Sequence, residues 1–171
     1  EKIQIPHPEE IEVIDRIRPN MPPDWYIPYE DNSRAVPAMA VFGDGYRYHV
    51  TGLIHDVRGF PTQRPDEIVP FLQRIFRKIN QHFFDIMLVD EYQTEDAELL
   101  VIAYGSVARS ARRAVSEARQ RGVRVGLAQL ITLWPFPRPI LEPLLRRVRA
   151  VLVPELNMGQ VSREVKRINQ G

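Results

Sequence analysis

The 171-residue sequence contains no cysteine. Disulfide bonds, thiolate ligands for zinc or iron–sulfur clusters, and a cysteine nucleophile are therefore excluded for this chain. Histidine is scarce as well, because its four copies are scattered without the spacing of a metal site. We expect any metal or redox chemistry to belong to a partner.

A strong excess of charge is also missing. Lysine and arginine number 23 against 22 aspartates and glutamates, which gives a formal net charge of +1. A dedicated nucleic-acid binder carries a strong basic field. We therefore interpret the basic residues between Arg146 and Arg167 as solvated helix faces and predict no nucleic-acid partner.

Long apolar runs are absent. No run approaches the roughly 18 residues of a membrane-spanning helix, and the first residues lack the basic-then-apolar order of a signal peptide. These two observations predict a soluble cytoplasmic protein without a membrane partner.

Proline is unevenly distributed. Nine of the 15 prolines lie within residues 1–65, and none lies between Pro70 and Pro135. Proline fixes φ and removes a backbone donor, so the early cluster disfavours long helices and central strands. The same region holds Trp25 and other large apolar residues and is too apolar for a solvated linker. We interpret residues 1–47 as a proline-rich extended arm and residues 48–171 as an α/β domain.

The periodicity of apolar residues predicts the elements of this domain. A Gly-Asp-Gly sequence at residues 43–45 predicts a hairpin turn followed by a short strand at 46–53. Apolar spacings of three and four predict an amphipathic helix at 66–84. Strands are predicted at 99–104, 123–130 and 150–153, and helices at 107–121, 137–149 and 159–168. This alternation is typical of a three-layer α/β/α fold with a mostly parallel sheet.

Gly105 and Ser106 stand where one of these strands turns into a helix. A helix N-terminus at that place offers free N–H groups to an anion, and Arg109, Arg112 and Arg113 would add to the attraction. The alternative is that Ser106 is the N-cap of the helix, because no glycine-rich phosphate motif is present. A free-standing phospholigand-binding module that uses Gly105 and Ser106 stays open as an alternative function.

Two further pairs of residues are candidates for function. His55 and Asp56 lie in a loop with several glycines and threonines, where they either contribute polar groups to an active site or stabilise a turn. Trp134 and Phe136 alternate with prolines, which fits an interface anchor and an internal plug equally well. No set of nucleophile, base and oxyanion donors for a stand-alone enzyme can be assembled.

Several motifs also form an ordered set. They are Tyr48-His49-Val50-Thr51-Gly52-Leu53 with His55-Asp56, Gly59 and Pro61-Thr62; Asp96 to Val101; Tyr104-Gly105-Ser106; Gly122 with Val125-Gly126-Leu127; Leu133 to Pro137; and Glu155 with Asn157 and Gly159-Gln160. This set, over roughly residues 46–168, resembles the second domain of the alpha subunit of 2-oxoacid:ferredoxin (acceptor) oxidoreductases, in particular those of the 2-oxoglutarate type.

The resemblance implies a transketolase C-terminal-like domain with five strands, one of them antiparallel. It also implies an enzyme complex that oxidatively decarboxylates a 2-oxoacid to an acyl-CoA, with coenzyme A as co-substrate and ferredoxin as electron acceptor. Thiamine diphosphate and Mg would lie between a beta subunit and a pyrimidine-binding domain that precedes this chain in the same subunit. Iron–sulfur clusters would belong to the beta subunit, and gamma and delta subunits can complete the complex.

On this resemblance we expect a structural and subunit-interface role for the chain, which alone would bind no cofactor and be inactive. His55 and Asp56 are the residues expected nearest the active site. Trp134, Phe136, Asn157 and Gln160 are the expected interface residues, and Gly105 and Ser106 are weak candidates for an anion site.

Overall fold

The computed structural model describes residues 5–13 and 15–169. The chain divides into two compact units, residues 1–81 and residues 82–171, called here the N-terminal unit and the C-terminal unit. The boundary between them follows the first long helix. Residues 48–81, which the sequence assigned to the α/β domain, therefore group with the proline-rich segment.

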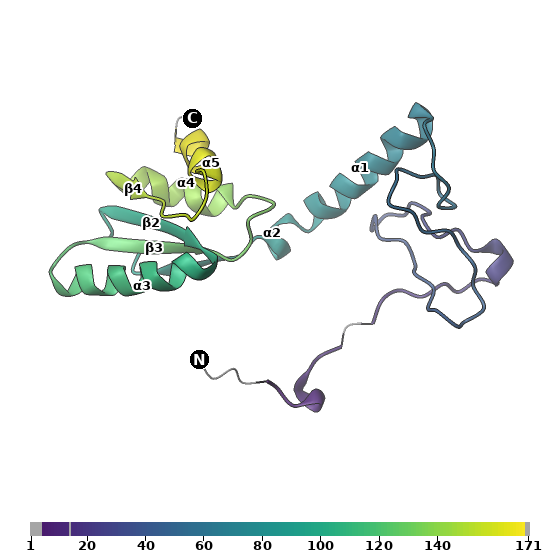
Figure 1. Cartoon of the computed structure of the whole chain (residues 1–171), viewed down its shortest axis with the longest axis horizontal. Helices are drawn as coiled ribbons and strands as arrows, with labels where there is room; N and C mark the ends of the chain where they lie inside the picture. Colours follow the sequence, from purple (N-terminus) through teal and green to yellow (C-terminus); the bar gives the residue numbers. More distant parts are fainter. Residues whose placement is uncertain (1–4, 14, 170–171) are drawn as a thin grey trace. The chain divides into compact units, whose positions relative to one another are not determined.

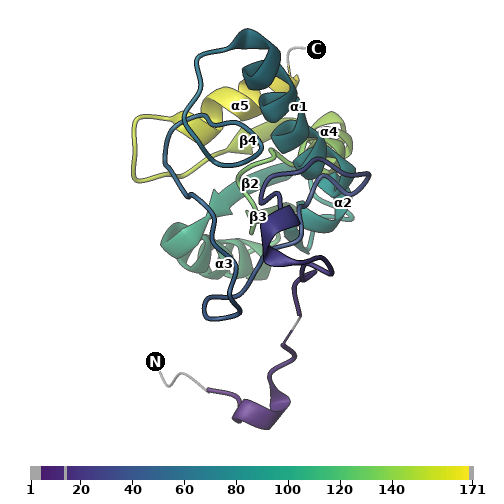
Figure 2. The ribbon, with the colours of Figure 1, turned by 90° about the vertical axis from the view of Figure 1, so that its right-hand side faces the viewer.

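The N-terminal unit is built from coil, two short 3-10 helices and one long helix (Figure 1, Figure 2). The 3-10 helices are η1 (Pro8–Glu10) and η2 (Pro23–Trp25), and the long helix is α1 (Pro65–Gln81). The strand expected at 46–53 is wrong, because these residues are coil and the nearest ladder contact is an isolated bridge between His55 and Pro61. The Gly-Asp-Gly segment does turn, with φ of 96° at Gly43 and 85° at Gly45.

Tyrosine packing takes the place of the expected strand. The buried ring of Tyr26 meets Tyr46 and Tyr48 edge-on, at centroid distances of 5.2 and 5.6 Å. Its hydroxyl donates to the Ala38 carbonyl at 2.9 Å and accepts the Ala40 N–H at 3.2 Å. Burial raises the pKa of the Tyr26 phenol above its ordinary value. One side chain thus joins extended segments that no sheet connects.

The C-terminal unit holds a four-stranded sheet. Its elements are α2 (Phe83–Ile86), β1 (Val89–Tyr92), β2 (Leu99–Tyr104), α3 (Gly105–Gln120), β3 (Val125–Leu130), α4 (Arg138–Arg147), β4 (Ala150–Leu152) and α5 (Gln160–Asn169). The strand order is β1-β3-β2-β4. β2, β3 and β4 are parallel, and β1 is antiparallel to β3. The mixed, mostly parallel sheet is confirmed, and the described residues form four strands where five were expected.

Helices cover both faces of this sheet, so the three-layer architecture is confirmed (Figure 1). Side chains alternate across a strand, and β2 accordingly sends Leu100 and Ile102 into one core and Ala103 into the other. The first core contains residues of α4 and α5, whereas the second contains residues of α3. The central strand β2 is therefore protected from solvent by both helical layers.

Arg119 of α3 fixes the connection between β1 and β2. Its guanidinium donates to the Gln93 carbonyl at 2.6 Å and to the Val125 carbonyl at 2.7 Å, and pairs with Asp96 at 2.7 Å. The hydrogen bond from Arg119 holds the pKa of Asp96 below its usual value. The bend at Gln93, where φ is 54°, thereby lies directly against Gly126 of β3.

None of the described helices is long and apolar enough to cross a membrane.

Gly126→Ala tests the contact between this bend and β3. An added Cβ would stand 2.7 Å from the Gln93 carbonyl oxygen, which is backbone held by Arg119 and cannot move freely. We expect a loss of about 1–3 kcal/mol in the free energy of unfolding, measured by chemical denaturation. Gly52→Ala, whose Cβ would meet nothing within 4 Å, is the control, and equal stability of the two variants would contradict the prediction.

Candidate functional site

The carboxyl ends of the three parallel strands meet at one edge of the C-terminal unit's sheet. In open α/β sheets, this is the edge where ligands bind. Three segments lie there: the start of α3, the loop 131–137 after β3, and the loop 153–159 after β4. The last of these projects from the unit as the yellow-green loop at the left of Figure 2. The candidate site therefore consists of the carboxyl ends of these strands and the segments that follow them.

Asn157 joins the end of β2 to the start of α5. Its side-chain amide donates to the hydroxyl of Tyr104, the last residue of β2. Its Oδ1 accepts the N–H groups of Gly159 at 2.8 Å and Gln160 at 3.2 Å. The amide is thus engaged within the loop, whereas Gln160 is exposed as the first residue of α5.

Glu155 occupies the N-terminus of α5. Its carboxylate accepts the backbone N–H of Val161 at 3.1 Å and that of Ser162 at 2.9 Å. Burial favours the neutral acid, but the hydrogen bonds to the carboxylate outweigh it, so the pKa of Glu155 lies below its ordinary value. A negative charge also suits the positive end of the helix. The anion position of this helix is therefore filled from within the chain.

The aromatic loop after β3 separates into an inner and an outer part. Pro135 and Pro137 are buried, and Phe136 packs against the core formed with α4 and α5. Trp134, in contrast, is 61% exposed. Phe136 thus packs inward as a plug would, whereas Trp134 is exposed.

Trp134 belongs to a group of exposed apolar residues at this edge, called here the apolar edge. Its members are between 42% and 87% exposed; they are Ile131, Leu133, Trp134, Leu156 and Met158. They come from the loops after two strands that both flank β2. Large exposed apolar residues gathered in one region are typical of a protein-binding surface.

Gly105 and Ser106 lie at the same edge, at the open start of α3. The N-cap of α3 is Tyr104, so the alternative that Ser106 is the N-cap is wrong. No side chain caps this helix among the described residues. Arg112 is paired with Asp90 and Arg113 with Glu117. These ion pairs reduce the positive charge that the sequence suggested for an anion here.

His55 and Asp56 lie in the N-terminal unit. The His55 ring is 6% exposed and lies against Tyr29, with centroids 4.0 Å apart, and edge-on to Phe71 at 4.8 Å. Its Nδ1 is 2.9 Å from the carbonyl oxygen of Asp56. This contact assigns the proton to Nδ1 in the neutral ring. His55 is thus a packed residue that attaches its loop to α1.

The Asp56 carboxylate closes the following turn. Its Oδ1 accepts the N–H of Arg58 at 2.9 Å and the N–H of Phe60 at 3.0 Å. Gly59 in the same turn has a φ of 92°, and a Cβ there would stand 2.1 Å from the His49 carbonyl oxygen. These contacts support the interpretation that His55 and Asp56 stabilise a turn.

A pocket of about 190 Å³ adjoins this loop and includes both His55 and Arg74 in its lining. Arg74 is the buried residue of α1, and burial lowers the pKa of its guanidinium. It donates to the Ala35 carbonyl at 3.4 Å and lies 5.7 Å from the centre of the Phe71 ring. Sequence reasoning missed Arg74, because the apolar pattern of α1 placed it outside the expected core face.

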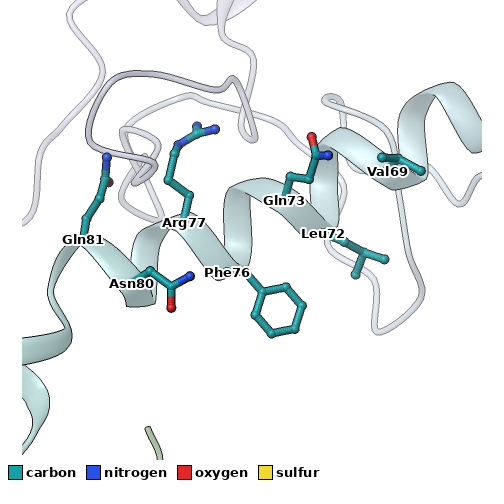
Figure 3. A pocket seen from close by; sticks show the side chains of 7 residues that line it. All are labelled: Val69, Leu72, Gln73, Phe76, Arg77, Asn80 and Gln81. Atoms are coloured by element: carbon teal, nitrogen blue, oxygen red, sulfur yellow. The ribbon is translucent and has the colours of Figure 1, made fainter. Parts of the chain in front are cut away.

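Part of the expected apolar stripe of α1 is exposed. Figure 3 shows Val69, Leu72 and Phe76 pointing away from the coil of the N-terminal unit, along one side of a shallow pocket of about 570 Å³. Arg77 and Gln81 extend toward that coil, where Arg77 pairs with Asp31. The N-terminal unit by itself therefore leaves an apolar stripe of its long helix exposed.

Comparisons with known proteins agree on one family. Residues 97–171 match the family model described as pyruvate:ferredoxin oxidoreductase core domain II. The chain is 41% identical over its whole length to 2-oxoglutarate synthase subunit KorA of Methanothermobacter marburgensis, of which it covers 45%. It is 39% identical to the subunit of the same name from Methanocaldococcus jannaschii, over 94% of this chain and 42% of that protein.

A solved structure also has a similar fold. It is the 2-oxoglutarate:ferredoxin oxidoreductase of Magnetococcus marinus, determined with 2-oxoglutarate, coenzyme A and succinyl-CoA bound to that protein. The TM-score is 0.78 at 25% identity, over 95% of this chain and 29% of the other.

The chain belongs to the alpha subunits of 2-oxoacid:ferredoxin oxidoreductases. The relationship that the ordered motifs suggested is thereby confirmed. The chain spans less than half the length of the curated relatives that it matches.

The described residues of this alpha-subunit chain do not fit a metal cofactor. Among them there is no group of three or more His, Cys, Asp or Glu side chains that could hold a metal ion. A Mg site needs such oxygen ligands and an iron–sulfur cluster needs thiolates, and the sequence has no cysteine. No catalytic step is therefore assigned to a metal held by these residues.

Glu155→Gln tests the cap of α5. The amide keeps an acceptor oxygen but loses the charge, so we expect a loss of about 0.5–2 kcal/mol in the free energy of unfolding near neutral pH. Because the folded-state pKa of Glu155 is lowered, its stabilisation is present above the ordinary carboxylate pKa and disappears as pH falls through the folded-state value. Denaturation at neutral and acidic pH should therefore show a smaller pH dependence for the variant. Glu164→Gln, which removes the exposed partner of Arg167, is the control, and an equal effect of both changes would refute the cap.

Proposed function

We propose that this chain is the structural and subunit-interface part of the alpha subunit of a 2-oxoglutarate:ferredoxin oxidoreductase. The observation that carries the proposal is the 41% identity to a 2-oxoglutarate synthase subunit over the whole chain. The solved relative with 2-oxoglutarate and succinyl-CoA supports the same substrate and the transfer of the acyl group to coenzyme A.

The proposed reaction is the oxidative decarboxylation of the 2-oxoacid with thiamine diphosphate, coenzyme A and ferredoxin. The cofactors belong to other parts of the complex: a preceding pyrimidine-binding domain and a beta subunit that carry thiamine diphosphate and Mg, and iron–sulfur clusters in the beta subunit. Gamma and delta subunits can complete it. The absence of cysteine in this chain supports the division, because cluster ligands must then come from elsewhere.

The apolar edge is the proposed interface with a neighbouring subunit. Trp134 is its largest member, and tryptophan is among the residues that most often dominate binding energy. The buried prolines on either side of Phe136 hold the loop in place, so Trp134 does not need to be ordered when the partner binds. Asn157 fixes the second loop of the edge in the same way, through Tyr104.

The loop at residues 51–62 is proposed as the part of the chain nearest the active site. In this role His55 positions the loop by packing between Tyr29 and Phe71. Asp56 contributes a negative charge near the active site, because only one oxygen of its carboxylate accepts hydrogen bonds in the described turn.

Trp134→Ala in the assembled enzyme tests the interface. We expect the dissociation constant of the alpha subunit and its partner to rise roughly tenfold or more relative to the unchanged enzyme. Analytical ultracentrifugation measures this change. Trp134→Phe is the matched variant, since it keeps an aromatic anchor and should retain most of the affinity. The thermal stability of the alpha subunit alone should not change, because Trp134 is exposed. Full assembly of the Trp134→Ala enzyme would refute the proposed interface.

Asp56→Asn in the assembled enzyme tests the loop. The amide oxygen can still accept the turn hydrogen bonds, so assembly should be unchanged while turnover with 2-oxoglutarate falls roughly tenfold through loss of the charge. Asp56→Ala also opens the turn and should lower both turnover and thermal stability. Normal turnover of Asp56→Asn would show that the residue serves the turn alone.

Calorimetry separates this proposal from the alternative of a phospholigand-binding module. The isolated chain is titrated with coenzyme A, thiamine diphosphate and nucleotides. We expect no binding, and binding at micromolar concentrations that is lost on Gly105→Ala would favour the module.

A further inference from the structure

Arg74 of α1 is a buried cation that pairs with no carboxylate among the described residues. Its side chain belongs to a residue that is 6% exposed, and its Nη1 donates to the Ala35 carbonyl at 3.4 Å. Arginine is almost never fully buried unless it is paired, because an isolated charge away from water is costly. The position therefore requires a counter-ion that the described residues do not supply.

The other N–H groups of Arg74 are free to bind one. No described residue accepts a hydrogen bond from its Nε or its Nη2. The fully buried side-chain polar atoms without a partner in the described part of the chain consist of Gln93 Oε1 alone, so these two nitrogens are accessible. Nε and Nη2 form one edge of the guanidinium, and such an edge binds both oxygens of a carboxylate at once.

Arg74 lines the small pocket beside the 51–62 loop. The pocket measures about 190 Å³, the space of roughly six water molecules at about 30 Å³ each. Its walls include Tyr29, Val57, Pro70 and Phe71. A few polar groups in a mostly apolar wall are typical of a small-molecule site. The pocket therefore suits a small ligand that has an apolar body and one charged group.

The acidic residues of the pocket restrict that charge. Asp31 pairs with Arg77, and Asp66 pairs with Arg64 at 2.6 Å. The hydrogen bonds from these two arginines hold the pKa of Asp31 and that of Asp66 below their ordinary values, so both carboxylates are charged near neutral pH. No lysine and no arginine besides Arg74 lines the pocket. A second negative charge on a ligand would meet these carboxylates and no cation.

We propose that this pocket binds a small monocarboxylate with an apolar body. The carboxylate of the ligand accepts hydrogen bonds from Nε and Nη2 of Arg74, and the apolar body lies against Val57 and Phe71. Dicarboxylates and phosphates are rejected, because their second charge stays close to Asp31 and Asp66. The site is therefore distinct from one for 2-oxoglutarate, which is a dicarboxylate.

The test uses para-fluorobenzoate, followed by fluorine NMR, with the assembled enzyme and with the 171-residue chain. We expect a dissociation constant in the millimolar range or below in both samples. The uncharged para-fluorobenzamide and a fluorinated phthalate, which carries a second carboxylate, should each bind at least roughly tenfold more weakly. Nuclear Overhauser contacts of the ligand with Val57 and Phe71 of the chain should locate it in the pocket.

Arg74→Met removes the charge, keeps most of the apolar stem and should weaken binding roughly tenfold or more. Arg34→Met is the matched control, because it makes the same change at an exposed arginine of the same unit outside the pocket, and it should leave the affinity within about twofold.

Val57→Trp tests the pocket without changing Arg74. The larger ring fills part of the space beside Phe71 and should also weaken binding roughly tenfold, while circular dichroism confirms that each variant is folded. Four results would overturn the proposal: no binding to the assembled enzyme, equal binding of the amide or of the phthalate, equal affinities of Arg74→Met and Arg34→Met, or full affinity of Val57→Trp. If Arg74→Met does not fold, the ligand series and Val57→Trp decide.

Discussion

The parallel pairing of β2 with both β3 and β4 is the constraint on which the C-terminal unit depends. It buries β2 between two helical layers, so Leu100 and Ile102 fill one core while Ala103 belongs to the other. The same pairing places the carboxyl ends of all three strands at one edge of the sheet. The loops of the proposed interface start from that edge, so the strands that form the core also position the proposed interface.

The helix termini at this edge support the proposal of a protein contact over that of ligand binding. Glu155 already occupies the N-terminus of α5, and Asn157 holds the loop before it. At the start of α3, the arginines of the helix are drawn into ion pairs such as Arg112 with Asp90. Large apolar side chains are exposed at this edge, above all Trp134 and its neighbours in the apolar edge.

Local periodicity was enough to predict the helices and strands of residues 99–169, because their apolar patterns and their turns agree. It failed at residues 46–53, where Tyr46 and Tyr48 pack on Tyr26 instead of pairing in a sheet. The site was predicted only in outline. Trp134 and Asn157 lie at the carboxyl edge of the sheet. The role of Glu155 depends on backbone N–H groups six and seven residues further along, and that of Arg74 on the carbonyl of Ala35, 39 residues away. Such contacts leave no periodic signal in a sequence.

Hydrogen exchange of the chain alone and within its assembled enzyme tests the central claim most directly, namely that the carboxyl edge of the sheet is the interface. The account predicts slower exchange on assembly in residues 131–137 and 153–159. It predicts unchanged exchange in residues 93–97, which connect β1 to β2 at the opposite edge. Exchange at the two loops that does not change on assembly would contradict the account.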